Sequence, residues 1–339
     1  MSSQNPVVDL MRLINSFQAS QAISVIAELG IANILKNDTL HSDAIAQATE
    51  CHPRSLYRLL HMLASVGVLE ELTGQHFKLT PIGECLRSDS SSKRSAWARY
   101  AGRPYVWQSW GDMMHSVKTG ESAFGHLHGA NLWEWRSKRL DEAEMFDAAM
   151  SELSGAAGKA VASSYDFSVF NVVVDVGGGQ GALLAAVLAQ HQNTKGILFD
   201  LPHVVVKAPE VLRAAGVTDR CEIVGGDVFK AVPEGGDAYL IKSVLMDEDD
   251  GQAIAILTAC RSAMGESGKV IVVEHLLTPP NGAEINFSDM TMMIMTGGRE
   301  RTREQFSELF SAAGFHLEQV VVTKSPFTLM VGSPASGSR

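Results

Sequence analysis

The sequence predicts an α/β fold, with a doubly wound and mostly parallel sheet preceded by a smaller helical domain. The first observation is the stretch 171–181, Asn-Val-Val-Val-Asp-Val-Gly-Gly-Gly-Gln-Gly, where a β-branched strand breaks into a glycine loop. The strongly helix-forming segment 182–189 follows directly. The second observation is that strand-like and helical stretches alternate over 166–333 and end in an antiparallel hairpin, which is typical of a doubly wound sheet.

Strand, glycine loop and helix together form a cradle in which backbone N–H groups meet a nucleotide-like ligand. The first three expected strands each carry or precede an acid, and these acids are Asp175, Asp200 and Asp227. Asp200 lies about where a ribose hydroxyl would be bound. A glycine loop alone is a weak signal, whereas three strand ends in register indicate a specific site.

Two ligands compete for this cradle. Gly177, Gly179 and Ala182 satisfy the dinucleotide fingerprint, which leaves NAD open. Asp175, inside the strand before the glycines, and the second acid Asp227 argue against NAD. This combination resembles the site of class I methyltransferases, and S-adenosylmethionine is therefore the cofactor that we expect.

Length and composition set further bounds. At 339 residues the chain exceeds the usual single domain, while 45% hydrophobic and 19% charged residues are ordinary for a globular protein. The net charge of −10 disfavours nucleic acid and anionic membrane as partners. The four cysteines form no CxxC pair, so we expect no metal site and no disulfides. Without a signal peptide or an apolar run of roughly 20 residues, a cytoplasmic protein is expected.

The first 100 residues predict a dimerisation module. Residues 7–35 are apolar at helical spacing and fit two helices, broken near 16–20 and ended at Gly30. Such an apolar start favours a subunit interface, and hence a homodimer. Residues 40–88 resemble a winged helix, which leaves a transcriptional regulator as a remote alternative. Because residues 1–100 hold nine basic and nine acidic side chains and no basic stripe, DNA binding is disfavoured.

We accordingly expect four segments. A winged-helix-like dimerisation domain occupies 1–100, and an aromatic-rich helical linker that walls a pocket occupies 101–165. The ligand-binding α/β domain occupies 166–333, and a flexible tail occupies 334–339.

Several motifs in one order give the chain a wider resemblance. They are the glycine loop, Thr119-Gly-Glu-Ser-Ala-Phe, Phe146-Asp-Ala-Ala-Met150 and Gly297-Gly-Arg-Glu-Arg-Thr. Over nearly its whole length the chain resembles the small-molecule O-methyltransferases of the caffeate and hydroxyindole type, including the bacterial enzymes that modify natural products. The resemblance implies a class I methyltransferase fold, a homodimer and a small, largely apolar or aromatic acceptor.

The resemblance also implies site residues. In such relatives the counterparts of Gly177, Asp200, Asp227, Val228 and Lys242 hold S-adenosylmethionine, and Asp175 and Gly179 belong to the same loop. The counterparts of Phe146, Met150 and Leu153 line the acceptor pocket. A run of methionines that includes Met292, together with Met246, suggests a soft apolar acceptor site, although packing is the simpler role for methionine.

The chain differs from this family at the position of the catalytic histidine. Relatives typically read Leu-Lys-x-Val-Leu-His-Asp-Trp-x-Asp, in which the histidine takes a proton from the acceptor hydroxyl. Here Met246 replaces that histidine and Glu248 the tryptophan, while the flanking acids match Glu274 and Glu300. A positioned base contributes about 10²–10⁴-fold in rate. Because methionine accepts no proton, the usual base is missing.

Four explanations stay open. The acceptor ionises unaided, or it is a nitrogen or an activated carbon. Alternatively Asp247, Glu274, Glu300 or His275 serves as the base. In the fourth, the cofactor is kept as a cationic fixture for a non-methylating reaction of the hydroxylase, decarboxylase or pericyclase type.

Structural roles compete with these chemical ones. Asp247 and Glu248 precede an expected helix at 249–260, whose dipole favours acids. His275 continues a strand and has even odds of facing away from a ligand. Glu274 and Glu300 would then brace Arg299 or Arg301 in ion pairs.

Overall fold

The computed structural model describes residues 5–91, 93–278, 280 and 282–335. The chain divides into two compact units, one ending at Trp107 and the other beginning at Gln108. The division falls within the range 101–165, where a helical linker is predicted. None of the helices in the described part of the chain is long and apolar enough to cross a membrane.

The first unit combines short helices with a small antiparallel sheet of order β1-β3-β2. Its helices are α1 (Pro6–Ile14), α2 (Ser16–Glu28), α3 (Ile31–Leu35), α4 (Ser42–Ala48), α5 (Pro53–Ser65), α6 (Pro81–Glu84) and α7 (Ser95–Ala101), and its strands are β1 (Leu40–His41), β2 (Leu69–Leu72) and β3 (His76–Leu79). The core gathers Ile31, Leu60 and Phe77, all fully buried. The winged-helix interpretation of this unit stays a prediction.

The predicted break between the first two helices lies close to the observed one. The break is at Asn15, next to the region 16–20 where it is expected. The Asn15 N–H still bonds back to Met11, but its backbone leaves the helical region, and α2 begins at once with Ser16. Serines within 16–20 favour caps over helix interiors, yet α2 is tertiary-packed through Ala22 and Ile26, which overrides that weak preference.

The second unit contains a seven-stranded sheet of order β11-β12-β8-β7-β4-β5-β6. Strands β4 to β8 pair in parallel within this sheet, and β12 and β11 complete it as an antiparallel edge. The strands are β4 (Val172–Val176), β5 (Lys195–Asp200), β6 (Cys221–Gly225), β7 (Ala238–Lys242), β8 (Lys269–Glu274), β11 (Phe315–Val322) and β12 (Thr328–Pro334), with a separate pair β9 (Leu276–Leu277) and β10 (Arg301–Thr302). The predicted doubly wound fold class is confirmed.

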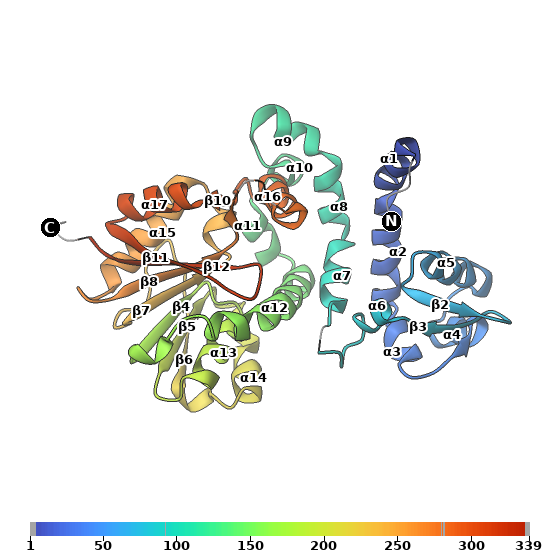
Figure 1. The fold of residues 1–339 in the computed structure, drawn as a ribbon, viewed down its shortest axis with the longest axis horizontal. Coiled ribbons are helices and arrows are strands. Elements are labelled where there is room, and N and C mark those ends of the chain that lie inside the picture. Colours follow the sequence, from blue (N-terminus) through green and yellow to red (C-terminus); the bar gives the residue numbers. More distant parts are fainter. Residues whose placement is uncertain (1–4, 92, 279, 281, 336–339) are drawn as a thin grey trace. The chain divides into compact units, whose positions relative to one another are not determined.

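Helices cover both faces of this sheet (Figure 1). The helices of this unit are α9 (Met113–Thr119), α10 (Ala123–His128), α11 (Leu132–Ser137), α12 (Leu140–Ala162), α13 (Ala182–Gln190), α14 (Ala208–Ala214), α15 (Asp250–Ala263), α16 (Ala283–Met295) and α17 (Arg303–Ala312), while α8 (Pro104–Gly111) spans the division between the units. Strand residues alternate between the faces. Val173 packs with α12, α13 and α14, whereas Val174 packs with α15 and α17.

The sheet reverses its winding beside β4. From β4 the chain builds outward through β5 and β6 on one side and through β7 and β8 on the other. In open α/β sheets, ligands bind outside the carboxyl ends of the strands at such a switch point. The segments that follow β4 and β7, which are 177–181 and 243–249, therefore mark the place for a site.

Candidate active site

The loop after β4 requires glycine. Gly177 has φ +67°, which L-residues rarely adopt, and its N–H donates to the Phe199 carbonyl at 2.8 Å. A Cβ at Gly177 would lie 2.6 Å from Cγ2 of Val244, which follows β7. The two strand ends at the switch point thus pack against each other through this glycine.

The acids of the next two strand ends make different contacts: Asp200 bonds to the glycine loop, whereas Asp227 bonds within the segment after β6. Asp200 accepts hydrogen bonds from the N–H of Gly179 at 2.7 Å and of Leu201 at 2.6 Å. Burial raises the pKa of Asp200, although these two hydrogen bonds act to lower it. Asp227, beyond β6, accepts from the Phe229 N–H at 3.0 Å and pairs with Lys230. The neighbouring Val228 is partly buried against the core.

A buried acid and a buried amine lie behind the glycines. The Asp175 carboxyl has no hydrogen-bond partner of normal geometry in the described residues, and burial and then Asp200 raise its pKa to about 7. Burial lowers the pKa of Lys242 to about 8, although the charges of Asp175 and Glu274 act in the opposite direction and raise it. Lys242 Nζ donates to Ser154 Oγ at 3.3 Å. A buried carboxyl without a partner is expensive unless a ligand satisfies it.

Helix α12 lies over this site. Ser151 donates to Gln180 in the glycine loop at 3.2 Å, one turn before Ser154 meets Lys242. The predicted pocket residues Phe146, Met150 and Leu153 are half-buried on the same helix at spacings of three and four, so they share one face.

The segment after β7 carries Met246 and the candidate catalytic residue Asp247. It runs through the 3₁₀ turn η4 (Leu245–Asp247), and Arg301, fully buried, donates to the carbonyls of Leu245 at 2.6 Å and Glu248 at 2.8 Å. Both Arg301 and Arg299 pair with Asp250. The alternative role expected of Glu274 and Glu300 is to brace these arginines in ion pairs. Among the described residues both arginines pair instead with Asp250, the first residue of α15.

Glu274 occupies the end of β8 and faces the Met246 backbone. Its Oε1 accepts from the N–H of Val244 at 3.2 Å and of Met246 at 3.1 Å. Its Oε2 is buried and has no hydrogen-bond partner in the described residues. Burial, reinforced by the charge of Glu300, raises the pKa of Glu274 to about 7.

Glu300 is buried and forms hydrogen bonds to His275 and to Ser288 of helix α16. Its Oε1 accepts from Ser288 Oγ at 2.7 Å and bonds to His275 Nδ1 at 3.0 Å, so His275 faces the site's acids. The buried Met292 lies one turn after Ser288 on α16. Glu300 Oε2, like Glu274 Oε2, is buried without a partner in the described residues.

Asp247 and Arg136 are two further charged residues of the site. Loss of hydration raises the pKa of Asp247 well above its ordinary value, with Glu248 and Glu274 adding to the effect and Arg136 opposing it. Arg136 is buried on α11, with its guanidinium 3.6 Å from the Phe146 ring centre. Phe146 thus lies under a cation whose field reaches Asp247.

Sequence reasoning missed three residues of this site. Ser151, Ser154 and Arg136 are helix residues that lie outside the motifs recognised in the sequence. Arg301 was in a recognised motif, but only the fold shows that it binds backbone carbonyls 53 and 56 residues earlier.

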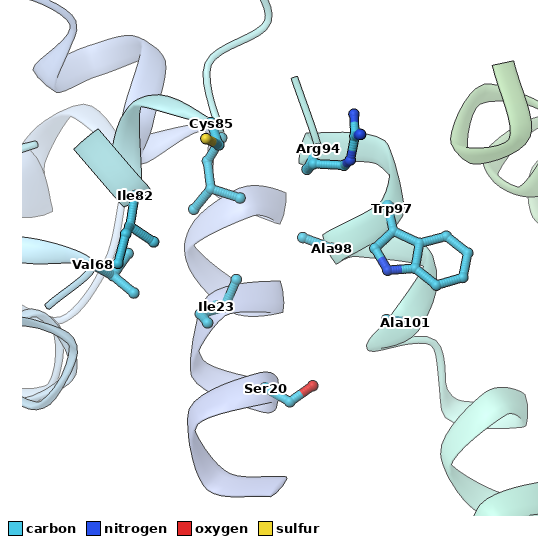
Figure 2. Close-up of a pocket in the computed structure, with 10 residues that line it drawn as sticks. Ser20, Ile23, Val68, Ile82, Cys85, Arg94, Trp97, Ala98 and Ala101 are labelled. Carbon is cyan, nitrogen blue, oxygen red and sulfur yellow. The ribbon is translucent and has the colours of Figure 1, made fainter. Parts of the chain in front are cut away.

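A separate cavity of about 400 Å³ lies in the first unit (Figure 2). Ile23 of α2, Ile82 of α6 and Trp97 and Ala98 of α7 line it, together with Arg94. Its lining is mostly apolar and includes no acid, so it offers none of the acid chemistry found at the switch point.

Comparisons with known proteins agree with this geometry. The sequence matches the O-methyltransferase domain over residues 108–316 and the O-methyltransferase dimerisation domain over residues 11–89. The chain belongs to the O-methyltransferase family. It is 37% identical to a phenazine O-methyltransferase from Lysobacter antibioticus, covering 96% of this chain and 95% of that one. It is also 31% identical to an aclacinomycin 10-hydroxylase from Streptomyces purpurascens, covering 91% of this chain and 84% of that one.

Solved structures extend the comparison. The structure of LaPhzM superposes with a TM-score of 0.94 at 35% identity, covering 97% of this methyltransferase and 99% of that chain. The O-methyltransferase NcsB1 from neocarzinostatin biosynthesis, solved with S-adenosyl-L-homocysteine and 1,4-dihydroxy-2-naphthoic acid, gives 0.80 at 29% identity, covering 93% and 95%. The predicted family, reaction class and cofactor are confirmed.

The residues at the switch point fit S-adenosylmethionine. The molecule carries ribose hydroxyls, an amino group and a sulfonium cation. Asp200 offers carboxylate oxygens at the position expected for the ribose, and the partnerless Asp175 offers a buried acceptor beside the glycine loop. The role of each single residue in holding the cofactor stays a prediction.

Proposed function

We propose that this methyltransferase methylates a hydroxyl of a small, largely apolar aromatic acceptor of the natural-product type, with Glu274 as the general base in place of the absent histidine. The observation that carries the proposal is the Oε2 of Glu274, which is buried beside Met246 and has no hydrogen-bond partner in the described part of the chain. A thioether cannot donate a hydrogen bond to that oxygen, which leaves it available to an acceptor hydroxyl.

The pKa of Glu274 suits this role. Raised to about 7 by burial and by Glu300, it lies near working pH, where a general base is most effective. The Val244 and Met246 N–H groups hold the other oxygen, so the carboxyl is oriented before the acceptor arrives.

The remaining residues of the site bind the cofactor and the acceptor, or position Glu274 and Met246. We assign cofactor binding to Asp175, Gly177, Gly179, Asp200, Asp227, Val228 and Lys242, and acceptor binding to Phe146, Met150, Leu153, Met246 and Met292. S-adenosylmethionine supplies the methyl group through its sulfonium. Asp247 and Glu300 shape the field at Glu274, and Arg301 holds the segment that carries Met246.

The test is a pH–rate profile of Glu274→Gln. Phenolic acceptors, 1,4-dihydroxy-2-naphthoic acid among them, are assayed with methyl-labelled cofactor. We expect wild-type kcat/KM to rise with pH through about 7, and Glu274→Gln to lose about 10²–10⁴-fold without weaker cofactor binding. Glu248→Gln, which changes a nearby acid on the segment after β7, should retain activity. Wild-type rates in Glu274→Gln would exclude Glu274 as the base.

A second candidate is a non-methylating reaction of the hydroxylase, decarboxylase or pericyclase type. Met246 in place of the expected histidine supports it, and so does the similarity to an aclacinomycin hydroxylase. The two candidates differ in one product: methyl transfer releases one S-adenosylhomocysteine per turnover. Sustained acceptor conversion without S-adenosylhomocysteine would favour the second candidate.

We also propose that the chain works as a homodimer through its first unit. Helix α1 has no buried residue in the single chain, and its apolar side chains are exposed. Together with the match to a dimerisation domain, this supports a second copy as the partner.

A further inference from the structure

Two histidines and two acids meet on α9 and α10, in residues that the reaction does not use. Asp112 caps α9, and its Oδ2 lies 2.7 Å from Nδ1 of His126 on α10. The His115 and His126 rings stack with centres 3.8 Å apart, and His115 Nε2 lies 3.5 Å from Glu121 Oε2. One ligand-capable atom from each of Asp112, His115 and His126 lies within 4.8 Å of the other two.

We propose that Asp112, His115 and His126 bind a divalent transition-metal ion such as Zn²⁺, with Glu121 as a fourth ligand. Imidazole nitrogen with one or two carboxylate oxygens is a common zinc donor set, and adjacent ligands of a tetrahedral ion at about 2.0–2.1 Å lie roughly 3.3 Å apart. The 2.7 and 3.5 Å separations in this cluster bracket that spacing.

The backbone around the cluster is fixed, whereas the outer ligands can adjust. Ser116 Oγ accepts from the Ala123 N–H at 2.9 Å, and Ser122 Oγ reaches the Ile294 carbonyl at 3.1 Å, so α9, α10 and α16 are joined. His115 is largely buried, but half of the His126 side chain is exposed. Because stacked rings point their lone pairs in parallel, His126 must turn toward His115 as the ion binds.

The ion would act as a structural cross-link between the start of α9 and α10. Helix α10 is bonded to α16, and Ser288 of α16 donates a hydrogen bond to Glu300. No step of the reaction passes through it. The expectation of no metal site rested on cysteine spacing and did not consider histidine with aspartate at positions 112, 115 and 126.

Tag-free protein dialysed against chelator provides the test. Titration with Co²⁺ should give the intense visible absorption of a four-coordinate ion at one equivalent per chain, and Zn²⁺ should displace it and raise Tm. Losing a ligand should weaken binding at least as much as losing an outer-shell partner, by about 10–100-fold or more, in His126→Ala and Asp112→Asn.

The matched control is His316→Ala, which removes an exposed histidine of β11. It should bind the ion like the wild type. S-adenosylmethionine affinity, measured on each variant, reports folding independently of the metal and of the proposed reaction. Absent binding at one equivalent, or equal binding by wild type, His126→Ala and Asp112→Asn, would overturn the proposal.

Discussion

Glu274 is costly to the folded state when it is ionised, because burial raises its pKa from 4.5 to about 7. The folded chain therefore binds this proton more tightly than the unfolded chain. The stability that protonated Glu274 contributes to the folded state is fully present below about pH 4.5 and is lost as pH rises through about 7. A shift of this size corresponds to about 3 kcal/mol of unfolding free energy.

Glu274→Gln should thus stabilise the protein at high pH while it removes activity. The amide oxygen can still accept from the Val244 and Met246 N–H groups. Urea unfolding at about pH 8 should show Glu274→Gln more stable than wild type, by up to about 3 kcal/mol, and at about pH 4.5 the difference should nearly vanish. A difference that grows toward low pH would contradict this sign.

Met246→His tests the missing base directly. A histidine there would stand beside Glu274 and Glu300 with an ordinary pKa of about 6.5. We expect methylation of a neutral phenol to become faster at about pH 6.5, where Glu274 is largely protonated. Met246→Leu keeps the apolar shape without a base and should show no gain. An equal gain in both variants would indicate a change of pocket shape instead.

At the scale of elements, Arg301 joins β10 to the segment 245–250. Arg301→Lys keeps the charge but cannot reach two backbone carbonyls and Asp250 together. We expect a loss of about 2–4 kcal/mol in unfolding free energy, since buried acceptors lose their donor. A lower kcat should accompany it, because Met246 and Glu274 then move apart.

Arg299→Lys is the control for this change. Arg299 pairs with the same Asp250, but both side chains are nearly half exposed. Such a pair contributes at most about 1 kcal/mol. Thermal unfolding and initial rates measured on both variants separate the two cases; equal losses would mean that Arg301 acts only through Asp250.

The sequence predicted those elements whose pattern is local. The strands at Val172 and Lys269 read as apolar runs, and the helix after Thr302 begins with a capping box. It failed where long-range contacts decide. The pairing of Arg301 with Asp250 and the contact of Ser154 with Lys242 depend on packing that no local window contains.

For the whole molecule, the alternation of strands and helices was enough to predict the doubly wound sheet and therefore the place of the cofactor site. Right-handed crossovers leave few topologies, and the acids at strand ends mark the carboxyl edge. The acceptor side was less predictable. Its groups, Glu274, Glu300 and His275, are ordinary residues whose chemistry arises from burial and from one another.

Dimerisation is the prediction that belongs to the whole molecule. Val7, Leu10, Leu13 and Ile14 are each more than half exposed in the single chain. Burying one leucine fully stabilises by about 1.5–3 kcal/mol, so a helix with this stripe favours a partner. Leu10→Glu with Leu13→Glu should give a monomer by light scattering at micromolar concentration. Cofactor affinity should persist, because the second unit has its own core.

Arg12→Glu is the matched control, since it adds an acid to the same helix without removing an apolar side chain. Arg12 is exposed and pairs only weakly with Asp9 at 3.3 Å, so the dimer should survive. Two results would contradict an interface on α1: a wild-type monomer at micromolar concentration, or a dimer that persists in the double variant. In the second case the exposed side chains of other first-unit helices, such as Phe17 and Val25 of α2, would hold the partner instead.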